Sequence, residues 1–120
     1  MSRTTVERRS HARFPSQFEI EGLSGDGGAI ARMVSHDLSL GGLQCSSSRD
    51  YKEMTRLAVR LLLPSDAAPE PVDVEAVVVR RREIPGASGG ARFELALFFT
   101  SMTDVCRERI ARYLAKQTAI

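Results

Sequence analysis

Short stretches that alternate apolar and polar residues recur along the chain, and they constrain its fold more than any other feature. The clearest are residues 57–63, 72–79 and 93–99. Apolar residues at every second position are typical of a β-strand with one face in a core. Clusters of glycine and proline separate these stretches and predict tight turns. The chain is therefore predicted to be mostly β.

The same pattern, with the turns, predicts six strands, and six short strands joined by tight turns favour a small antiparallel barrel or sandwich. The predicted strands are 17–21, 29–35, 43–46, 57–63, 72–82 and 93–99. Alternation also predicts which side chains of the two most regular strands face inward: Leu57, Val59, Leu61, Leu63, Phe93, Leu95, Leu97 and Phe99.

The last twenty residues change to helical periodicity. Ser101 is predicted to cap this helix, with Asp104 completing a capping box. The predicted apolar face consists of Met102, Cys106, Ile110, Tyr113 and Leu114, and the predicted polar face of Arg107, Glu108, Arg112 and Lys116. Such a helix is expected to cover one mouth or face of the barrel.

Length and charge limit the class of protein further. A chain of 120 residues suits one domain, and a formal net charge of +2 is too small for bulk attraction to nucleic acid or membrane. No apolar run approaches the roughly twenty residues of a membrane helix, and the amino terminus lacks a signal sequence. Cys45 and Cys106 lack metal-ligand or disulfide spacing. We therefore expect a cytoplasmic protein without metal or cofactor.

Residues 1–15 differ from the rest because they are basic and carry no apolar periodicity. They are predicted to form a flexible arm that orders on binding a ligand, and residues 16–120 to form the barrel with its helix. The arm holds Arg9-x-x-x-Arg13. This spacing is weak on its own, because the composition predicts roughly two by chance and Arg56 and Arg60 form the other.

The segment Asp37-x-Ser39-x-x-Gly42 is more specific, with about 0.04 chance occurrences expected in such a chain. It also fits a strand-ending turn, in which Asp and Ser bond the local backbone and glycines take positive φ. Arginine forks can bond guanine O6 and N7 or bridge phosphates. A carboxylate such as that of Asp37 can accept from guanine N1 and N2, and Gly41 and Gly42 let a ligand approach the backbone. The two segments together predict an anion-binding site.

Together, Arg9-x-x-x-Arg13 and Asp37-x-Ser39-x-x-Gly42 resemble the PilZ domain, the bacterial receptor module for cyclic di-GMP. The resemblance implies a six-stranded antiparallel β-barrel with a C-terminal α-helix, and a non-enzymatic receptor. It implies that Arg9 and Arg13 contact guanine and phosphate, and that Asp37, Ser39 and Gly42 form the opposite wall. Arg8 is a further expected phosphate contact. Because the domain uses nearly the whole chain, we expect no output module and a signal passed to a separate protein. The family implies motility, adhesion or polysaccharide export machinery.

Three alternatives remain. His36, Asp37 and Ser39 are triad residue types, but neighbours on an extended strand do not readily place a base between nucleophile and carboxylate. Arg80, Arg81 and Arg82 form a basic run that a single-stranded nucleic acid could bind, although the sequence offers few aromatic platforms for stacking. A PilZ-like adaptor that binds protein without nucleotide is the third.

Overall fold

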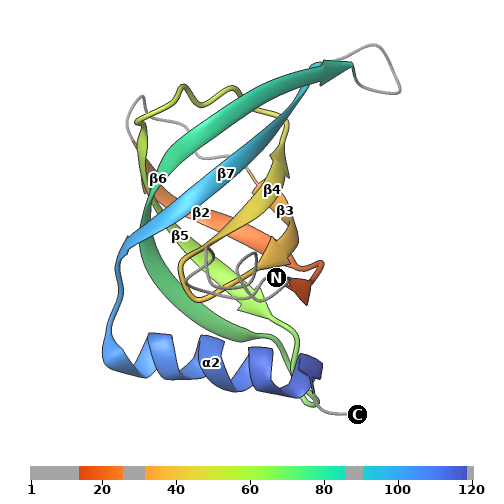
Figure 1. The fold of residues 1–120 in the computed structure, drawn as a ribbon, viewed down its shortest axis with the longest axis vertical. Coiled ribbons are helices and arrows are strands. Elements are labelled where there is room, and N and C mark those ends of the chain that lie inside the picture. Colours follow the sequence, from red (N-terminus) through yellow and green to blue (C-terminus); the bar gives the residue numbers. More distant parts are fainter. Residues whose placement is uncertain (1–13, 26–31, 86–90, 119–120) are drawn as a thin grey trace, which may run out of the picture.

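The computed structural model describes residues 14–25, 32–85 and 91–118, which form seven strands and one helix (Figure 1). The chain is mostly β, as predicted. The elements are β1 (Phe14–Pro15), β2 (Glu19–Gly25), β3 (Arg32–Leu38), β4 (Gly42–Ser47), β5 (Arg56–Leu63), β6 (Glu70–Pro85), β7 (Ala91–Ser101) and α2 (Asp104–Thr118).

Six of the strands close into an antiparallel barrel. Their order is β3-β2-β5-β6-β7-β4, and a further pairing of β4 with β3 closes the ring. The two-residue β1 pairs with the end of β3, where Phe14 lies opposite Leu38 and Pro15 opposite Asp37. Closure leaves no long free edge in the barrel, so this order confirms the predicted six-stranded barrel.

The barrel interior is the apolar core. All eight side chains predicted to face inward from 57–63 and 93–99 are buried, and Ile20, Met33, Leu43 and Val72 join them from other strands. The alternation therefore predicted the core face correctly in the regular strands.

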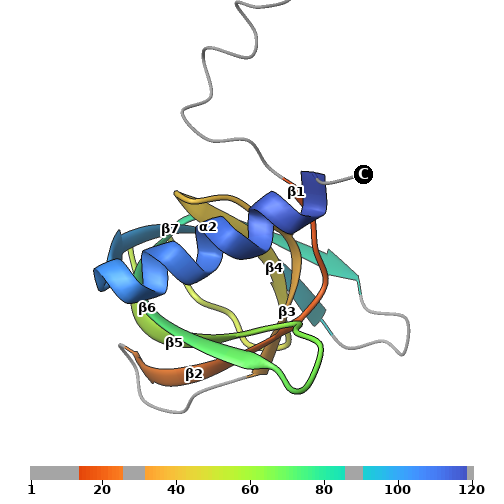
Figure 2. The same cartoon turned by 90° about the horizontal axis from the view of Figure 1, so that it is seen from below.

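Helix α2 lies across one end of the barrel (Figures 1 and 2). Ile110 and Leu114 of α2 are buried against the barrel, and the predicted polar face is exposed. The helix therefore presents its apolar face to the barrel, as predicted. The predicted cap was wrong: Ser101 ends β7, and the hydroxyl of Thr103 accepts from the Cys106 amide at 3.1 Å. The cap moves two residues along because the strand continues further than the sequence pattern indicates. Helix α2, the one helix in the described ranges, is too short and polar to span a membrane.

Several strands are longer than predicted. Strand β3 continues through Leu38, so the predicted turn over 37–42 contracts to Ser39–Gly41. Strand β6 has 16 residues and β7 has 11, and their hairpin extends beyond the barrel (Figure 1). The predicted arm lies outside the described residues except at its end, where Phe14 and Pro15 form β1.

Candidate functional site

A one-residue bulge in β3 turns Asp37 to the outside of the barrel. Ser35 pairs with Cys45 and Asp37 pairs with Gln44, so His36 is the extra residue. Met33 and Ser35 are buried, and strict alternation would also direct Asp37 inward. The bulge shifts the phase by one residue, and the half-buried Asp37 reaches the outer surface instead. Its Oδ1 accepts a hydrogen bond from the Gln44 amide at 3.3 Å.

The turn after β3 is held by the Ser39 hydroxyl. This oxygen accepts from the amides of Gly41 and Gly42 and donates to the Gly42 carbonyl, each at 3.2 Å. The Ser39 amide also donates to the Gly42 carbonyl at 2.9 Å. Ser39 is buried. Its role in the structure is therefore to shape the turn, as the strand-ending interpretation predicted.

Gly42 is required by the approach of two strands within the protein. A Cβ added at this position would lie 2.1 Å from the Leu97 carbonyl oxygen on β7. The neighbouring Gly41 carbonyl accepts from the Phe99 amide at 2.9 Å, which ties the turn to the same strand. The glycine of the segment thus lets β4 lie against β7, independently of any ligand.

A second bulge, in β6, places Arg80 on the same outer face. Val72, Val74, Ala76 and Val78 are buried at even positions, so a regular strand would direct Arg80 inward. Val78 pairs with Leu97 and Arg80 with Ala96, which leaves Val79 as the extra residue. Beyond it the phase is reversed, and Arg80 and Arg82 face outward.

Arg81 consequently points to the opposite side of β6 from its two neighbours. Its guanidinium donates two hydrogen bonds to the Asp50 carboxylate and lies 5.2 Å from the centre of the Phe93 ring. These bonds to Arg81 lower the pKa of Asp50 below its usual value. The predicted basic run of three arginines is therefore divided between two faces.

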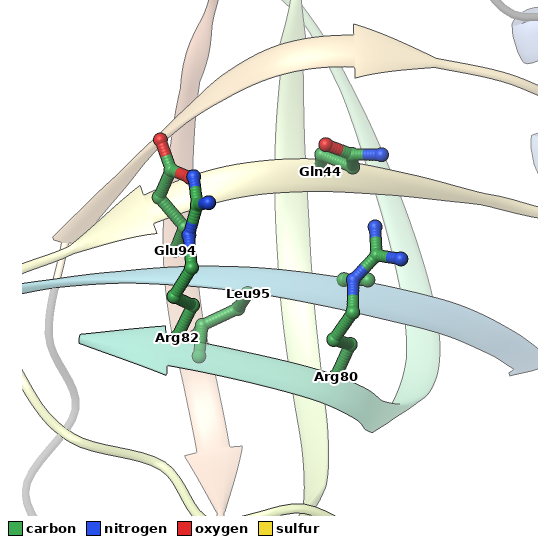
Figure 3. Close-up of a pocket in the computed structure, with 6 residues that line it drawn as sticks. Gln44, Arg80, Arg82, Glu94 and Leu95 are labelled. Atoms are coloured by element: carbon green, nitrogen blue, oxygen red, sulfur yellow. The ribbon is translucent and has the colours of Figure 1, made fainter. Parts of the chain in front are cut away.

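A pocket of about 290 Å³ lies on the outer face of β4, β7 and β6 (Figure 3). Arg80 and Arg82 extend over it from β6, and Gln44, Glu94, Leu95 and Ala96 complete its lining. Arg82 donates to the Glu94 carboxylate, and this bond holds the pKa of Glu94 below its usual value. Among the described residues, Arg80 has no ion-pair partner. Two guanidiniums against one carboxylate make the pocket suitable for an anion.

Cross-strand registers connect this pocket to Asp37. Asp37 lies opposite Gln44, Gln44 opposite Ala96, and Ala96 opposite Arg80, in one row across four strands. We call the outer surface of β3, β4, β7 and β6 around this row the site face. Sequence reasoning noted the arginine run but did not place Arg80 and Arg82 in this site, since the run carries no sign of the bulge.

Of the seven predicted site residues, the structure brings four together beside the site face. Asp37 lies in its central row, and Ser39, Gly41 and Gly42 form the adjoining turn and the start of β4. The predicted ligand contacts of Arg8, Arg9 and Arg13 lie outside the described residues. The base of their arm is held in place next to Asp37: the Ser16 amide donates to the His36 carbonyl at 2.9 Å, and the Ser16 hydroxyl bonds that of Tyr113.

His36, Asp37 and Ser39 do not form a catalytic triad. His36 Nε2 bonds the Ser46 hydroxyl, whereas the Ser39 hydroxyl is engaged in its own turn. Cys45 is also unsuited to nucleophilic chemistry, because burial, with a smaller contribution from Asp37, raises its pKa to about 12. In the ranges the structure covers, no cluster of His, Cys, Asp and Glu could hold a metal ion.

The fold and this site define a small antiparallel barrel domain with a pocket on its outer face that two arginines line. The model of the PilZ domain family matches residues 7–116, so the chain belongs to the PilZ domain family. No curated protein sequence matches it.

Solved structures agree with the fold. The PilZ domain with c-di-GMP of YcgR from Escherichia coli is 15% identical, with a TM-score of 0.68 over 92% of this chain and 91% of that one. The inhibitor of motility MotI/DgrA from Bacillus subtilis is 18% identical, with a TM-score of 0.73 over 92% of this chain. Apo MrkH from K. pneumonia is 14% identical, with a TM-score of 0.70 over 88% of this chain. The chain spans 50% of the MotI chain and 49% of the MrkH chain.

Proposed function

We propose that this protein is a receptor for cyclic di-GMP that acts in the cytoplasm, without catalysis, and passes the signal to a separate protein. The observation that carries the proposal is the shared face of Asp37, Arg80 and Arg82. A carboxylate at one end of a row and guanidiniums at the other suit a ligand that combines guanine with phosphate. The PilZ domain of YcgR, a relative of the same fold, was solved with c-di-GMP.

The arm can supply further contacts because its base is anchored at the site face. Pro15 lies opposite Asp37, and Arg13 precedes it by two residues and Arg9 by six. Fully extended chain spans at most about 7 Å and about 21 Å over these separations. Both side chains are therefore within reach of a ligand on the site face, where we propose that they bond guanine and phosphate and that Arg8 bonds phosphate.

We propose distinct roles for the residues of the barrel. Asp37 accepts from guanine N1 and N2, which selects guanine over adenine. Ser39, Gly41 and Gly42 form the wall beside it, where the turn held by Ser39 shapes the backbone that the ligand meets. Arg80 supplies a charge-assisted bond to phosphate or to guanine O6 and N7.

Binding is expected to order the arm over the ligand, and this ordering would be the signal. Backbone amides between Arg9 and Phe14 should exchange more slowly with solvent when cyclic di-GMP is added. Unchanged exchange there, in a sample that demonstrably binds, would show that the arm is not the switch. A partner in motility, adhesion or export would then read another part of the complex.

Arg80 and Arg82 lie on one face of β6 and Arg81 on the other, which disfavours the nucleic-acid alternative. A single-stranded nucleic acid bound along one groove could not contact all three arginines. Titration calorimetry with cyclic di-GMP, cyclic di-AMP and a single-stranded oligonucleotide separates the candidates. We expect saturable binding of cyclic di-GMP alone. A flat titration at high micromolar ligand would favour the nucleotide-independent adaptor, and oligonucleotide binding that falls steeply with salt would favour nucleic acid.

A further inference from the structure

Phe98 exposes an aromatic ring on the site face. The residue is 53% exposed, whereas Phe18, Phe93 and Phe99 are buried and Phe14 is partly buried against the core. Among the described phenylalanines it is therefore the one ring available to a ligand. An exposed aromatic ring offers a flat apolar face on which another ring can stack.

The position of Phe98 links the pocket to the Ser39–Gly41 turn. On β7 it follows the pocket residue Ala96 by two positions, about 7 Å along the same face. It lies directly opposite Gly42 on β4. Gly42 has no side chain, so no cross-strand side chain on β4 lies beside the ring at this position.

The other neighbour of Phe98 is apolar as well. Val77 lies opposite it on β6, and the bulge residue Val79, just before Arg80, is 49% exposed. The site face thus has a polar row from Asp37 to Arg80 and, next to it, an apolar row from Gly42 to Val77. This combination matches a purine base, which has an apolar ring face and a polar edge.

We propose that the Phe98 ring is a stacking platform for one purine base of the bound cyclic dinucleotide, an inference that rests on the proposed receptor function. The base lies on the ring while its polar edge meets the row that runs from Asp37 to Arg80. Stacking of a base on an aromatic side chain is sequence-tolerant, so Phe98 contributes affinity, and guanine selectivity stays with Asp37.

Calorimetry on four proteins tests this inference: wild type, Phe98→Leu, Phe98→Ala and the control Val105→Ala. Val105 is also exposed and apolar, at 58%, but it belongs to α2 and not to the site face. Removing a base–aromatic stack should weaken cyclic di-GMP binding by roughly 5- to 150-fold. Phe98→Leu keeps most of the apolar bulk and loses the ring, and the control should bind like wild type. Because Phe98 is exposed, all variants should keep the melting temperature of wild type.

A proton NMR measurement identifies the stacking directly. The guanine H8 resonance of bound ligand should move upfield in wild type, because a proton above an aromatic ring is shielded, and this shift should be reduced in Phe98→Leu. If wild type does not bind cyclic di-GMP at all, the receptor proposal fails and the inference with it. If wild type binds, but Phe98→Ala binds equally well and H8 does not move, the inference alone is overturned and the receptor proposal stands.

Discussion

Asp37 and Arg80 lie at the two ends of one row across β3, β4, β7 and β6, and each follows a bulge residue that turns it outward. Three interstrand spacings separate their backbones, about 14 Å across the strands of the sheet. Gln44 and Ala96, both uncharged, lie between them. A ligand that spans the row therefore meets an acceptor at one end and a cation at the other.

Arg80→Ala should weaken cyclic di-GMP binding by about ten- to a hundred-fold, because a charge-assisted bond is lost. Its neighbour Arg81 is the matched control, since it faces the other side and pairs with Asp50. Arg81→Ala should leave affinity near wild type and lower the melting temperature only slightly, as expected of an exposed pair. Calorimetry and thermal melts of both variants check this. Equal loss of affinity in both would place the ligand elsewhere.

The two pairs of arginines with the same spacing should behave differently. Arg9→Ala or Arg13→Ala should weaken binding by about ten- to a hundred-fold without changing the melting temperature of the free protein. The control is the double variant Arg56→Ala with Arg60→Ala. Arg60 bonds Asp73 on the barrel surface at 2.7 and 3.1 Å, away from the site face, so affinity should stay within a few-fold. The reverse pattern would show that Arg56 and Arg60, and not Arg9 and Arg13, contact the ligand.

Gly42→Ala should destabilise the fold before it affects the ligand. The new Cβ would lie 2.1 Å from the Leu97 carbonyl oxygen, a backbone atom that cannot move aside without shifting β7. We expect a loss of about 1–3 kcal/mol in the free energy of unfolding, the range for overpacked positions. Urea unfolding measures it, and Ser48→Ala, at an exposed loop position, is the control. A variant as stable as wild type that has lost binding would instead show that Gly42 serves the ligand alone.

Stability should fall in acid partly through Asp73. Hydrogen bonds from Arg60 hold the Asp73 pKa below the value of 3.8 that serves for an unperturbed Asp. The unfolded chain therefore takes up this proton at higher pH than the folded protein does. The contribution of the pair is complete at neutral pH and is lost as the pH falls below about 4. Unfolding free energies at pH 6 and pH 3 should differ less in Asp73→Asn than in wild type, and an equal difference would contradict the assignment.

Much of the fold follows from local pattern in the sequence. Alternation in 57–63 and 93–99 predicted the buried faces of β5 and β7, because these strands keep a strict period of two through the core. Helical spacing predicted that Ile110 and Leu114 face the barrel. The Asp37-x-Ser39-x-x-Gly42 segment predicted a turn and, together with Arg9-x-x-x-Arg13, a resemblance to the PilZ domain family, which the match over residues 7–116 confirms.

What only the tertiary structure decided is which side chains meet on the outer face. Counting by twos from the buried Met33 and Val78 directs Asp37 and Arg80 into the core, and the two bulges reverse this. A bulge depends on how two strands pair across the barrel, and residues far apart in the chain determine that pairing. The need for glycine at Gly42 likewise comes from Leu97, which lies 55 positions away in the sequence and directly beside it in the barrel.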